Sequence, residues 1–236
     1  YGLLFLLLSH SISAREIRIN PDTHLKSVLK RVDPGDSLVL ANGTWKDLEL
    51  RFERLAGTAK RPIHIRAESP GKVVLTGTVR FQVSGKHVIV SGLAFRNPAG
   101  MTSVFEFRTH SERLAHHCRI TECSFEQRDA SSDEKSLWLN VYGTNNRVDH
   151  CYFAGKRNVG TTLVVWVDEE TPGSHRIDHN HFGPRPELGE NGGETIRVGT
   201  SDVSESVSRT IVEENYFQRC SGEAEIISNK SCENFY

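Results

Sequence analysis

Two short stretches, Val148-Asp-His-Cys-Tyr-Phe153 and Ile177-Asp-His-Asn-His-Phe182, share one pattern that indicates the fold of this chain. In both, a β-branched apolar residue is followed five positions later by phenylalanine. The same pair recurs elsewhere, as Val90/Phe95, Ile120/Phe125 and Val212/Phe217. Successive phenylalanines are 30, 28, 29 and 35 residues apart, a self-similarity that is typical of a solenoid. Because each period contains only short strand-like runs and turns, we predict an all-β parallel β-helix.

A second register supports this prediction. The residues two positions before each phenylalanine are Leu93, Cys123, Cys151, Asn180 and Asn215. In a β-helix such positions stack at the strand spacing of about 4.8 Å. We therefore expect the two asparagines to form an amide ladder inside the coils. The two stacked cysteines are either free thiols or a disulfide, since this spacing falls within the Cα window of about 4.4–6.8 Å for a bridge.

An amphipathic helix is predicted near the amino terminus. Residues 23–32 carry apolar side chains at helical spacing, Asp22 or Thr23 can cap the helix, and Pro34-Gly35 ends it. A solenoid needs a cap over its hydrophobic end. We expect this helix to be that cap, and the β-helix to run from about residue 35 to residue 236.

The composition bounds the class of protein. The chain has 236 residues, 37% of them hydrophobic, which is enough for one sizeable core. Its 29 basic and 30 acidic side chains nearly cancel, which argues against a dedicated nucleic-acid binder but not against a local basic groove for a polyanion. No apolar run is long enough to span a bilayer. The five cysteines match no zinc spacing, and we interpret most of them as small buried hydrophobes.

The two ends of the chain give further expectations. Residues 1–14 resemble the hydrophobic part of a secretory signal peptide, with cleavage after Ala14. Residues 15–236 would then form one domain of an exported, secreted or periplasmic, bacterial protein. The sequence stops at Asn234-Phe-Tyr236, where we expect another coil to begin, so we expect the domain to be incomplete at its carboxyl end.

A later stretch, Gly222-Glu-Ala-Glu-Ile-Ile-Ser-Asn-Lys-Ser231, carries candidate chemistry. Glu223 and Glu225 are separated by one residue, so on a strand their side chains project from the same face. With the carboxamide of Asn191 upstream, they suit a hard cation such as Ca²⁺, which takes oxygen ligands. A lysine beside a cation, here Lys230, can act as a base if its pKa is lowered. The alternative is a solvated acidic strand followed by a surface lysine.

Residues 191–201 (NGGETIRVGTS) and 222–231 (GEAEIISNKS) resemble two signature segments of polysaccharide lyase family six, in the same order. That family contains alginate lyases and chondroitinase B. The resemblance extends from about Ile17 to the chain end. It implies a right-handed parallel β-helix with an amino-terminal cap, in agreement with the periodicity.

The resemblance also implies roles for residues of the site. Asn191, Glu223 and Glu225 resemble the calcium ligands of the family, and Lys230 resembles its catalytic base. The Brønsted acid of the family is an arginine on a later coil, which this sequence does not reach. Arg197 does not replace it on motif grounds.

Two neighbours of these residues have supporting roles in the prediction. Arg197 could bind a carboxylate of the substrate, or it could form a salt bridge to Glu194 or another neighbour. Glu194 could support the metal site by orienting the residues that bind the metal, without binding it itself.

The implied function is a secreted, calcium-dependent lyase that cleaves alginate by β-elimination. The enzymatic alternative is a chondroitinase B-like lyase for dermatan or chondroitin sulfate. A different class is a non-catalytic carbohydrate-binding β-helix, which would have no need of Lys230. A hydrolase of the pectinase type would use paired acids and would also leave Lys230 without a role. Uronate preference, endo or exo action and oligomeric state stay open.

Other candidates have simpler interpretations. The histidines at 116, 117, 150, 175, 179 and 181 could suggest a metal cluster, but His150 and His179 fall at equivalent positions and more simply form an exposed stacked pair. Trp45, Trp138 and Trp166 could stack on sugar rings or pack in the core or at a groove edge. Residues 168–170 (DEE) are interpreted as a solvated turn.

Overall fold

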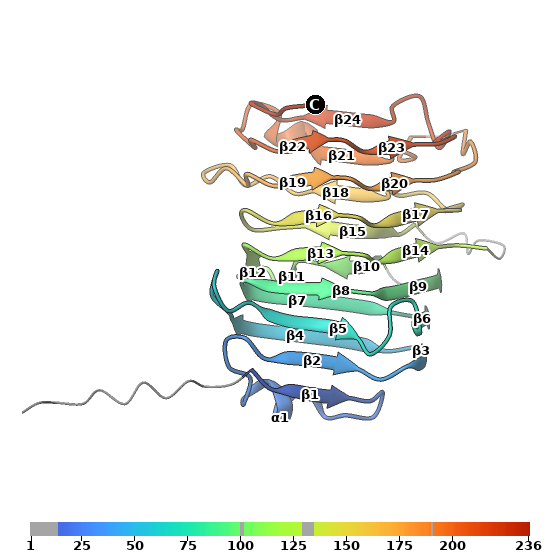
Figure 1. Ribbon diagram of the computed structural model, residues 1–236. Coiled ribbons are helices and arrows are strands. Elements are labelled where there is room, and N and C mark those ends of the chain that lie inside the picture. The colour runs from blue at the N-terminus through green and yellow to red at the C-terminus, as the bar shows by residue number, and fades with distance from the viewer. Residues whose placement is uncertain (1–13, 100–101, 129–134, 190) are drawn as a thin grey trace, which may run out of the picture.

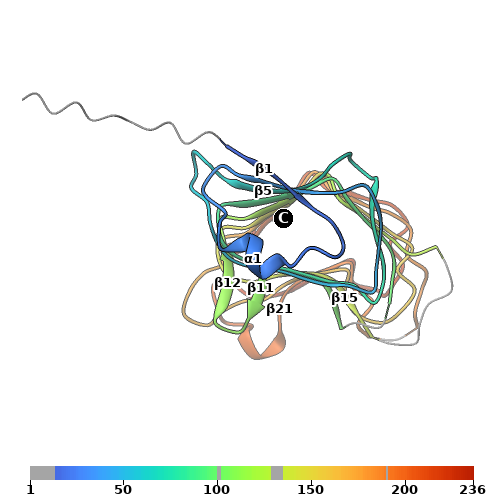
Figure 2. The ribbon, with the colours of Figure 1, turned by 90° about the horizontal axis from the view of Figure 1, so that it is seen from below.

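The chain folds into coils that stack along a single axis. The computed structural model describes residues 14–99, 102–128, 135–189 and 191–236. Successive coils rise from β1 to β24 (Figure 1), and seen along the axis they lie over one another around a common centre (Figure 2). Each coil passes through parallel sheets on its different sides. The predicted all-β parallel β-helix is confirmed.

Three sheets form the walls. The first contains β1 (Glu16–Ile19), β2 (Ser37–Leu40), β5 (Ile63–Ala67), β8 (Val88–Ser91), β13 (Arg119–Thr121), β16 (Arg147–Asp149), β19 (Arg176–Asp178) and β22 (Ile211–Glu213). The second contains β4 (Glu49–Ala56), β7 (Arg80–Lys86), β10 (Ser103–Glu106), β11 (Arg108–His110), β12 (Arg113–His116), β15 (Leu137–Val141), β18 (Leu163–Val165), β21 (Ile196–Gly199) and β24 (Ile227–Lys230). The third contains β3 (Gly43–Lys46), β6 (Val73–Gly77), β9 (Leu93–Pro98), β14 (Ser124–Glu126), β17 (Tyr152–Ala154), β20 (His181–Phe182) and β23 (Tyr216–Phe217). A short 3-10 helix, η1 (Ser201–Val203), follows β21.

The repeated phenylalanines stack inside the third sheet, as predicted. Phe95, Phe125, Phe153, Phe182 and Phe217 are register partners on neighbouring strands. Their ring centroids are 4.3, 5.0, 5.0 and 5.1 Å apart, with nearly parallel planes. Because side chains alternate along each strand, every coil adds one ring to the same stack.

The second predicted register is also present. The side-chain oxygen of Asn215 accepts the backbone and side-chain N–H groups of Asn180 at 2.9 and 3.0 Å. Asn180 in turn accepts the backbone N–H of Cys151 at 3.0 Å, which continues the amide ladder. All five cysteines are free thiols, so Cys123 and Cys151 stack without a bridge. Burial and the neighbouring Cys123 raise the pKa of Cys151, and four of the five cysteines are buried as expected.

The amino-terminal cap differs from the prediction in its bounds. The helix α1 (Leu25–Leu29) is shorter than expected, and the residue before it is His24, not Asp22 or Thr23. The Thr23 hydroxyl instead accepts the backbone N–H of Asn20. The strand β1 precedes the helix, so the β-helix begins near residue 16 and not near residue 35. The helix still covers the end of the first coil, where Val28 is buried (Figure 2).

The signal-peptide prediction concerns residues 1–14, of which 1–13 lie outside the described residues. In the part of the chain that the structure describes, no helix is long and apolar enough to cross a membrane.

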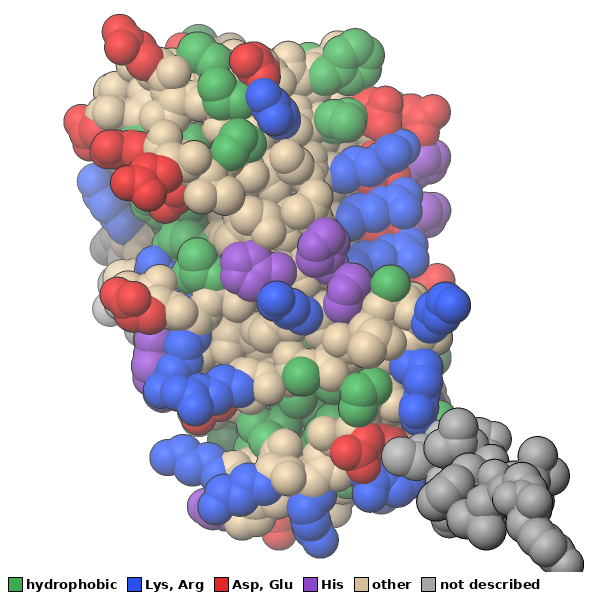
Figure 3. All heavy atoms as spheres, turned by 90° about the vertical axis from the view of Figure 1, so that its left-hand side faces the viewer, with side chains coloured by type: hydrophobic (Ala, Val, Ile, Leu, Met, Phe, Trp, Pro, Cys, Tyr) green, Lys and Arg blue, Asp and Glu red, His purple; other side chains and the backbone are tan. Residues whose placement is uncertain are grey.

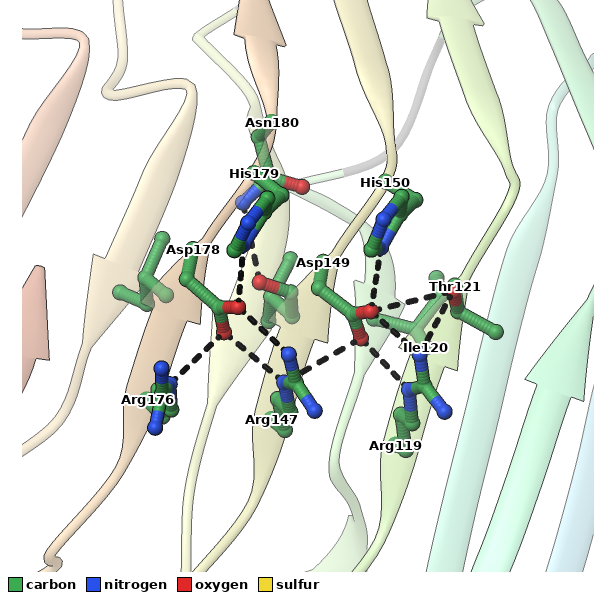
Figure 4. A network of polar contacts seen from close by, with 12 residues as sticks. Arg119, Ile120, Thr121, Arg147, Asp149, His150, Arg176, Asp178, His179 and Asn180 are labelled. Atoms are coloured by element: carbon green, nitrogen blue, oxygen red, sulfur yellow. Dashed lines mark hydrogen bonds and ion pairs between the residues drawn. The ribbon is translucent and has the colours of Figure 1, made fainter. Parts of the chain in front are cut away.

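Buried carboxylates at the ends of β16 and β19 link neighbouring strands of the first sheet (Figure 4). Asp178 is fully buried and accepts hydrogen bonds from Arg147 at 2.8 and 2.5 Å, while its Oδ2 lies 2.7 Å from Nδ1 of His179. The previous coil repeats this with Asp149 and His150 at 2.6 Å. Burial raises the pKa of Asp178, but the hydrogen bonds from Arg147 and His179 outweigh it and hold the pKa below its usual value. The two imidazoles stack at 5.2 Å, which confirms the expected pair.

Candidate active site

A large hollow lies beside the last coils and contains most of the predicted site. Its volume is about 850 Å³, and Asn191, Glu194, Glu223, Glu225 and Lys230 all line it. The lysine is the last residue of β24, and the other four lie in the turns that precede β21 and β24. Residues separated by up to 39 positions in sequence thus meet because adjacent coils present their turns on the same side.

The paired glutamates lie in a turn, which corrects the prediction that they project from one strand. Glu223 and Glu225 precede β24, whose first residue is Ile227. The turn passes very close to the coil below: a β-carbon on Gly193 would lie 2.3 Å from the carbonyl oxygen of Gly222. The chain bends here because two glycines let the backbones touch. Both carboxylates nevertheless line the same hollow.

The carboxylate of Glu223 is held by backbone groups. Its Oε2 accepts the N–H groups of Gly192 and Gly193, each at 2.7 Å. Glu225 and Asn191 are exposed, and neither side chain has a hydrogen bond or ion pair within the described part of the chain. One oriented carboxylate, one free carboxylate and one free carboxamide therefore face the hollow.

Glu194 forms the floor of the site. Only 2% of it is exposed, and its Oε2 accepts the hydroxyl of Thr161 at 2.9 Å. In sequence, Glu194 directly follows Gly192 and Gly193, whose N–H groups donate to the Glu223 carboxylate. This position agrees with the predicted supporting role behind the ligands, which stays a prediction.

Sequence reasoning missed Arg185, which supports this floor. Its buried guanidinium donates to the carbonyl oxygens of Gly193 and Glu194 at 2.7 and 2.8 Å. It also donates to those of Asn158 and Gly160 at 3.1 and 2.8 Å, so it joins two coils. Burial lowers its pKa to about 10, although nearby carboxylates oppose that shift. It stands between two prolines in sequence and belongs to no recognisable motif, so nothing in the pattern pointed to it.

Lys230 is half-buried on the outer face of the second sheet. It is the register partner of Gly199 on the coil below. Across the described ranges, no carboxylate lies within ion-pair distance of its ammonium group. A lysine without an acidic partner in the described ranges, in one hollow with Asn191, Glu194, Glu223 and Glu225, is placed to exchange a proton with a bound molecule.

Arg197 does not line the hollow and does not form the alternative salt bridge. Its guanidinium carbon lies 5.6 Å from the ring centre of Trp166, and its Nε is buried without a hydrogen-bond partner. Within the residues that the structure describes, no carboxylate pairs with it. It is the register partner of Ser228 of β24, on the neighbouring coil.

The remaining candidates have structural explanations. Histidines gather near the middle of the face that Figure 3 shows. The rings of His87 and His117, each of which lies between the second and the first sheet in sequence, stack at 5.0 Å. Among the described residues, no three His, Cys, Asp or Glu side chains are placed to hold a metal. Trp45 and Trp138 are each 1% exposed and belong to the core, whereas Trp166 is half-buried at the surface. The acidic turn at 168–170 is exposed, as expected.

Comparisons with known proteins identify related chains. The family model for chondroitinase B matches residues 19–236. A mannuronic acid specific polysaccharide family 6 lyase from human gut microbiota is 38% identical, with a TM-score of 0.84 over 93% of this chain. The family 6 alginate lyase AlyGC is 46% identical, with a TM-score of 0.86 over 93% of this chain. The family 6 polysaccharide lyase Pedsa3628 from Pseudopedobacter saltans is 25% identical, with a TM-score of 0.76 over 93% of this chain.

This chain spans only part of those structures. It covers 52% of the gut lyase, 31% of AlyGC and 51% of Pedsa3628. No curated protein matches the chain significantly.

Proposed function

This chain belongs to polysaccharide lyase family six, and from that membership we propose that it cleaves alginate, an anionic uronate polysaccharide, by β-elimination. The observation that carries the proposal is the hollow in which Asn191, Glu223 and Glu225 face Lys230. A surface acidic strand followed by an unrelated lysine would not bring these four side chains together.

β-Elimination needs a base beside C-5 of the uronate. The base takes the C-5 proton, the electron pair forms the C-4–C-5 double bond, and the oxygen at C-4 departs and is protonated. Lys230 is the proposed base, acting through a neutral Nζ. It suits this role because it lies at the end of strand β24, half-buried, with no acidic partner in the described ranges. A carbohydrate-binding module would have no use for such a group.

We propose that Asn191, Glu223 and Glu225 hold Ca²⁺. The donor set fits, because Ca²⁺ takes carboxylate and carboxamide oxygens. Glu223 has one oxygen fixed by Gly192 and Gly193 and leaves the other free, and Glu225 is unpaired in the described structure. When bound, the ion would supply Lewis-acid neutralisation of the uronate carboxylate.

Arg197 is proposed to bind a substrate carboxylate. Its guanidinium lacks an acidic partner among the described residues and keeps a buried Nε unpaired. A planar guanidinium matches a carboxylate geometrically, which a lysine at this position would not do. This contact would orient the sugar while Lys230 abstracts the proton.

Alginate is the first choice of substrate because AlyGC is described as an alginate lyase and the gut relative as mannuronic acid specific. Dermatan sulfate is the second candidate, since the matching family model is that of chondroitinase B. Export of the protein is part of the proposal, because these polymers lie outside cells.

The test is direct measurement of the unsaturated product. The full-length protein, its variants Lys230→Ala and Lys230→Arg, and the exposed control Lys72→Arg are incubated with polymannuronate and with dermatan sulfate, and the ultraviolet absorbance of the product is followed. We expect activity in the wild type and the control. Both Lys230 variants should lose at least about 10²–10⁴-fold, since a guanidinium stays protonated. Near wild-type activity of Lys230→Arg would exclude Lys230 as the base.

A further inference from the structure

A hollow separate from the candidate active site lies where the chain passes from the second sheet to the first. Its volume is about 310 Å³. The segment between β4 and β5 lines it, together with the residues that lead into β8, β13 and β16. It shares no lining residue with the hollow at Lys230. We call it the histidine pocket, because His87 and His117 both line it.

The backbone places three polar side chains of this pocket side by side. His87, His117 and Asn145 occupy equivalent corners of successive coils, with φ angles of 50°, 53° and 55°. Histidine and asparagine are among the residues most often found in this left-handed conformation. The N–H of His87 donates to the His116 carbonyl at 3.1 Å, and that of His117 to the Thr144 carbonyl at 2.9 Å. Hydrogen bonds between coils therefore fix the positions from which these side chains project.

The two imidazoles of the pocket keep their polar atoms available. The rings of His87 and His117 stack at 5.0 Å, and within the described residues no ring nitrogen of either one has a hydrogen-bond or ion-pair partner. The other stacked pair differs: Nδ1 of His150 and Nδ1 of His179 lie 2.6 and 2.7 Å from buried aspartate oxygens. The second pair is thus used by the fold itself, whereas the first can bind another molecule.

Two guanidinium groups of the pocket also keep a free donor. Arg119 and Arg147 line the pocket, and each donates through Nε and Nη2 to one buried aspartate, Asp149 or Asp178. The Nη1 group of neither arginine has an acceptor among the described residues, and Figure 4 shows one nitrogen of each without a dashed line. Both side chains are therefore held in place by one edge and open at another.

The charge around the pocket is positive. No Asp or Glu in the described ranges lines it, and the neighbouring Lys86 is exposed without an ion pair in those ranges. Figure 3 shows basic side chains beside the grouped histidines. Burial, His117 and Lys86 lower the pKa of His87, and the same causes act on His116, which lines a different hollow. An anion bound beside His87 would oppose this shift, so its binding should take up protons.

The rest of the lining is apolar. Ala59, Pro62 and Ile89 contribute to it, and the volume lies at the lower end of the range of about 300–1,000 Å³ for small-molecule sites. A free inorganic ion would use only the polar part of this space. A sugar acid, which carries one carboxylate on a ring with C–H groups, would use both parts.

We propose that the histidine pocket is a non-catalytic binding site for a small oxoanion. Its carboxylate or sulfate group would accept hydrogen bonds from the imidazoles of His87 and His117 and from the free Nη1 groups of Arg119 and Arg147. Guanidinium groups suit such planar or tetrahedral oxygen sets. The oxoanion is carried by a sugar acid or is a free inorganic ion, and the apolar lining favours the sugar acid. The site does not depend on the proposed lyase activity, because the two hollows have no residue in common.

The experiment is calorimetry of the full-length protein with three probes: sodium glucuronate, sodium sulfate and glucose, the uncharged counterpart of glucuronate. Wild type is compared with the double variant His87→Asn/His117→Asn, since Asn145 shows that asparagine fits this corner. A second variant, Ala59→Asp, leaves both imidazoles in place and adds a carboxylate on the exposed turn of the pocket. The control is His181→Asn, whose imidazole lies between two tyrosine rings on the third sheet.

Wild type and the control should bind glucuronate and sulfate but not glucose. Both pocket variants should bind these anions at least about tenfold more weakly, as expected for the loss of one or two charge-assisted hydrogen bonds or for added repulsion. Binding to wild type should strengthen as the pH falls from about 7.5 to about 5.5, because the imidazoles become charged. Activity on polymannuronate should be the same in the double variant as in wild type.

The outcomes decide the proposal and its ligand. Tighter binding of glucuronate than of sulfate would identify a sugar-acid site, and the reverse order would identify a site for a free ion. If neither anion binds wild type more tightly than glucose does, or if either pocket variant binds them as wild type does, the proposal is overturned. Loss of lyase activity in the double variant would show that the pocket is not separate from catalysis. A protein that binds the anions but cleaves no polyuronate would contradict only the proposed function.

Discussion

Gly199 and Lys230 are register partners on neighbouring coils, and they are in backbone contact. A β-carbon on Gly199 would lie 2.2 Å from the carbonyl oxygen of Lys230, and the φ angle of the glycine is 82°. A side chain at this position would therefore strain the backbone and push the lysine away from the coil beneath it. The glycine fixes the height of Lys230 above the sheet.

Gly199→Ala should therefore lower activity through Lys230. A displacement of about 1 Å at a catalytic group can cost about 10²-fold, so we expect kcat to fall by about 10- to 100-fold. The matched control is Gly155→Ala, whose glycine has a φ angle of 79° and whose added β-carbon would lie 2.1 Å from the Gln127 carbonyl oxygen. Both variants should lose about 1–3 kcal/mol in urea unfolding. Equal kcat values for the two variants would contradict the positioning role.

Glu225→Gln should weaken calcium binding. The substitution keeps the shape of the side chain but removes one of the two carboxylate charges from the proposed ligand set. Calorimetry should show affinity for Ca²⁺ at least about tenfold lower than in wild type, which corresponds to about 1.4 kcal/mol. Ca²⁺ should also raise the Tm of wild type more than that of the variant, because a ligand stabilises the state that binds it. Glu169→Gln in the exposed acidic turn is the control, and identical affinities in the two variants would refute the site.

Arg185→Met should loosen the floor of the site. It removes a guanidinium that donates to four buried carbonyl oxygens, and each buried group left unpaired costs about 1–3 kcal/mol. We expect a loss of about 3 kcal/mol or more in the free energy of unfolding, together with weaker Ca²⁺ binding. The exposed control Arg219→Met should change neither. A variant as stable as wild type would show that the carbonyl oxygens find other partners.

Lys156 should make stability depend on pH. Its side chain is 1% exposed, and burial, with a smaller effect of Arg185, lowers its pKa to about 6. In the unfolded chain a lysine has a pKa of about 10.4, so between these values the unfolded state binds more protons. Burial of Lys156 therefore lowers the free energy of unfolding by its full amount below about pH 6. This destabilisation becomes smaller as the pH rises and is gone above about pH 10.4, the pKa of an unfolded lysine.

The check uses Lys156→Met, which cannot titrate at this position. Relative to this variant, wild type should gain up to about 1.4 kcal/mol of stability per pH unit between pH 6.5 and 9. Urea unfolding of both proteins across this pH range gives the difference between their free energies of unfolding. The other titrating groups are the same in both proteins, so their contributions cancel in this difference. Parallel pH profiles would mean that Lys156 is charged in the folded protein or hydrated there.

The sequence alone predicted the repeating parts of the molecule. Phe153 and Phe182 stack because each coil repeats one local pattern, and a period near 30 residues is visible without any contact being known. The acidic motif and Lys230 were found by their similarity to a family pattern. The cap helix was predicted in the right region, but its bounds and its place after β1 were not, since helix ends depend on tertiary contacts.

The sequence by itself therefore determined the class of fold and its inner stacks, because these depend on local alternation and repeated spacing, and it identified the motif residues through their resemblance to a family pattern. Only the tertiary structure decided which side chains meet across coils. Tyr142, Trp166, Gly199 and Lys230 are 24, 33 and 31 residues apart, and these unequal intervals show no period. Their alignment follows from backbone hydrogen bonds between coils, and Arg185 meets its four carbonyl oxygens because the turns of two neighbouring coils lie side by side.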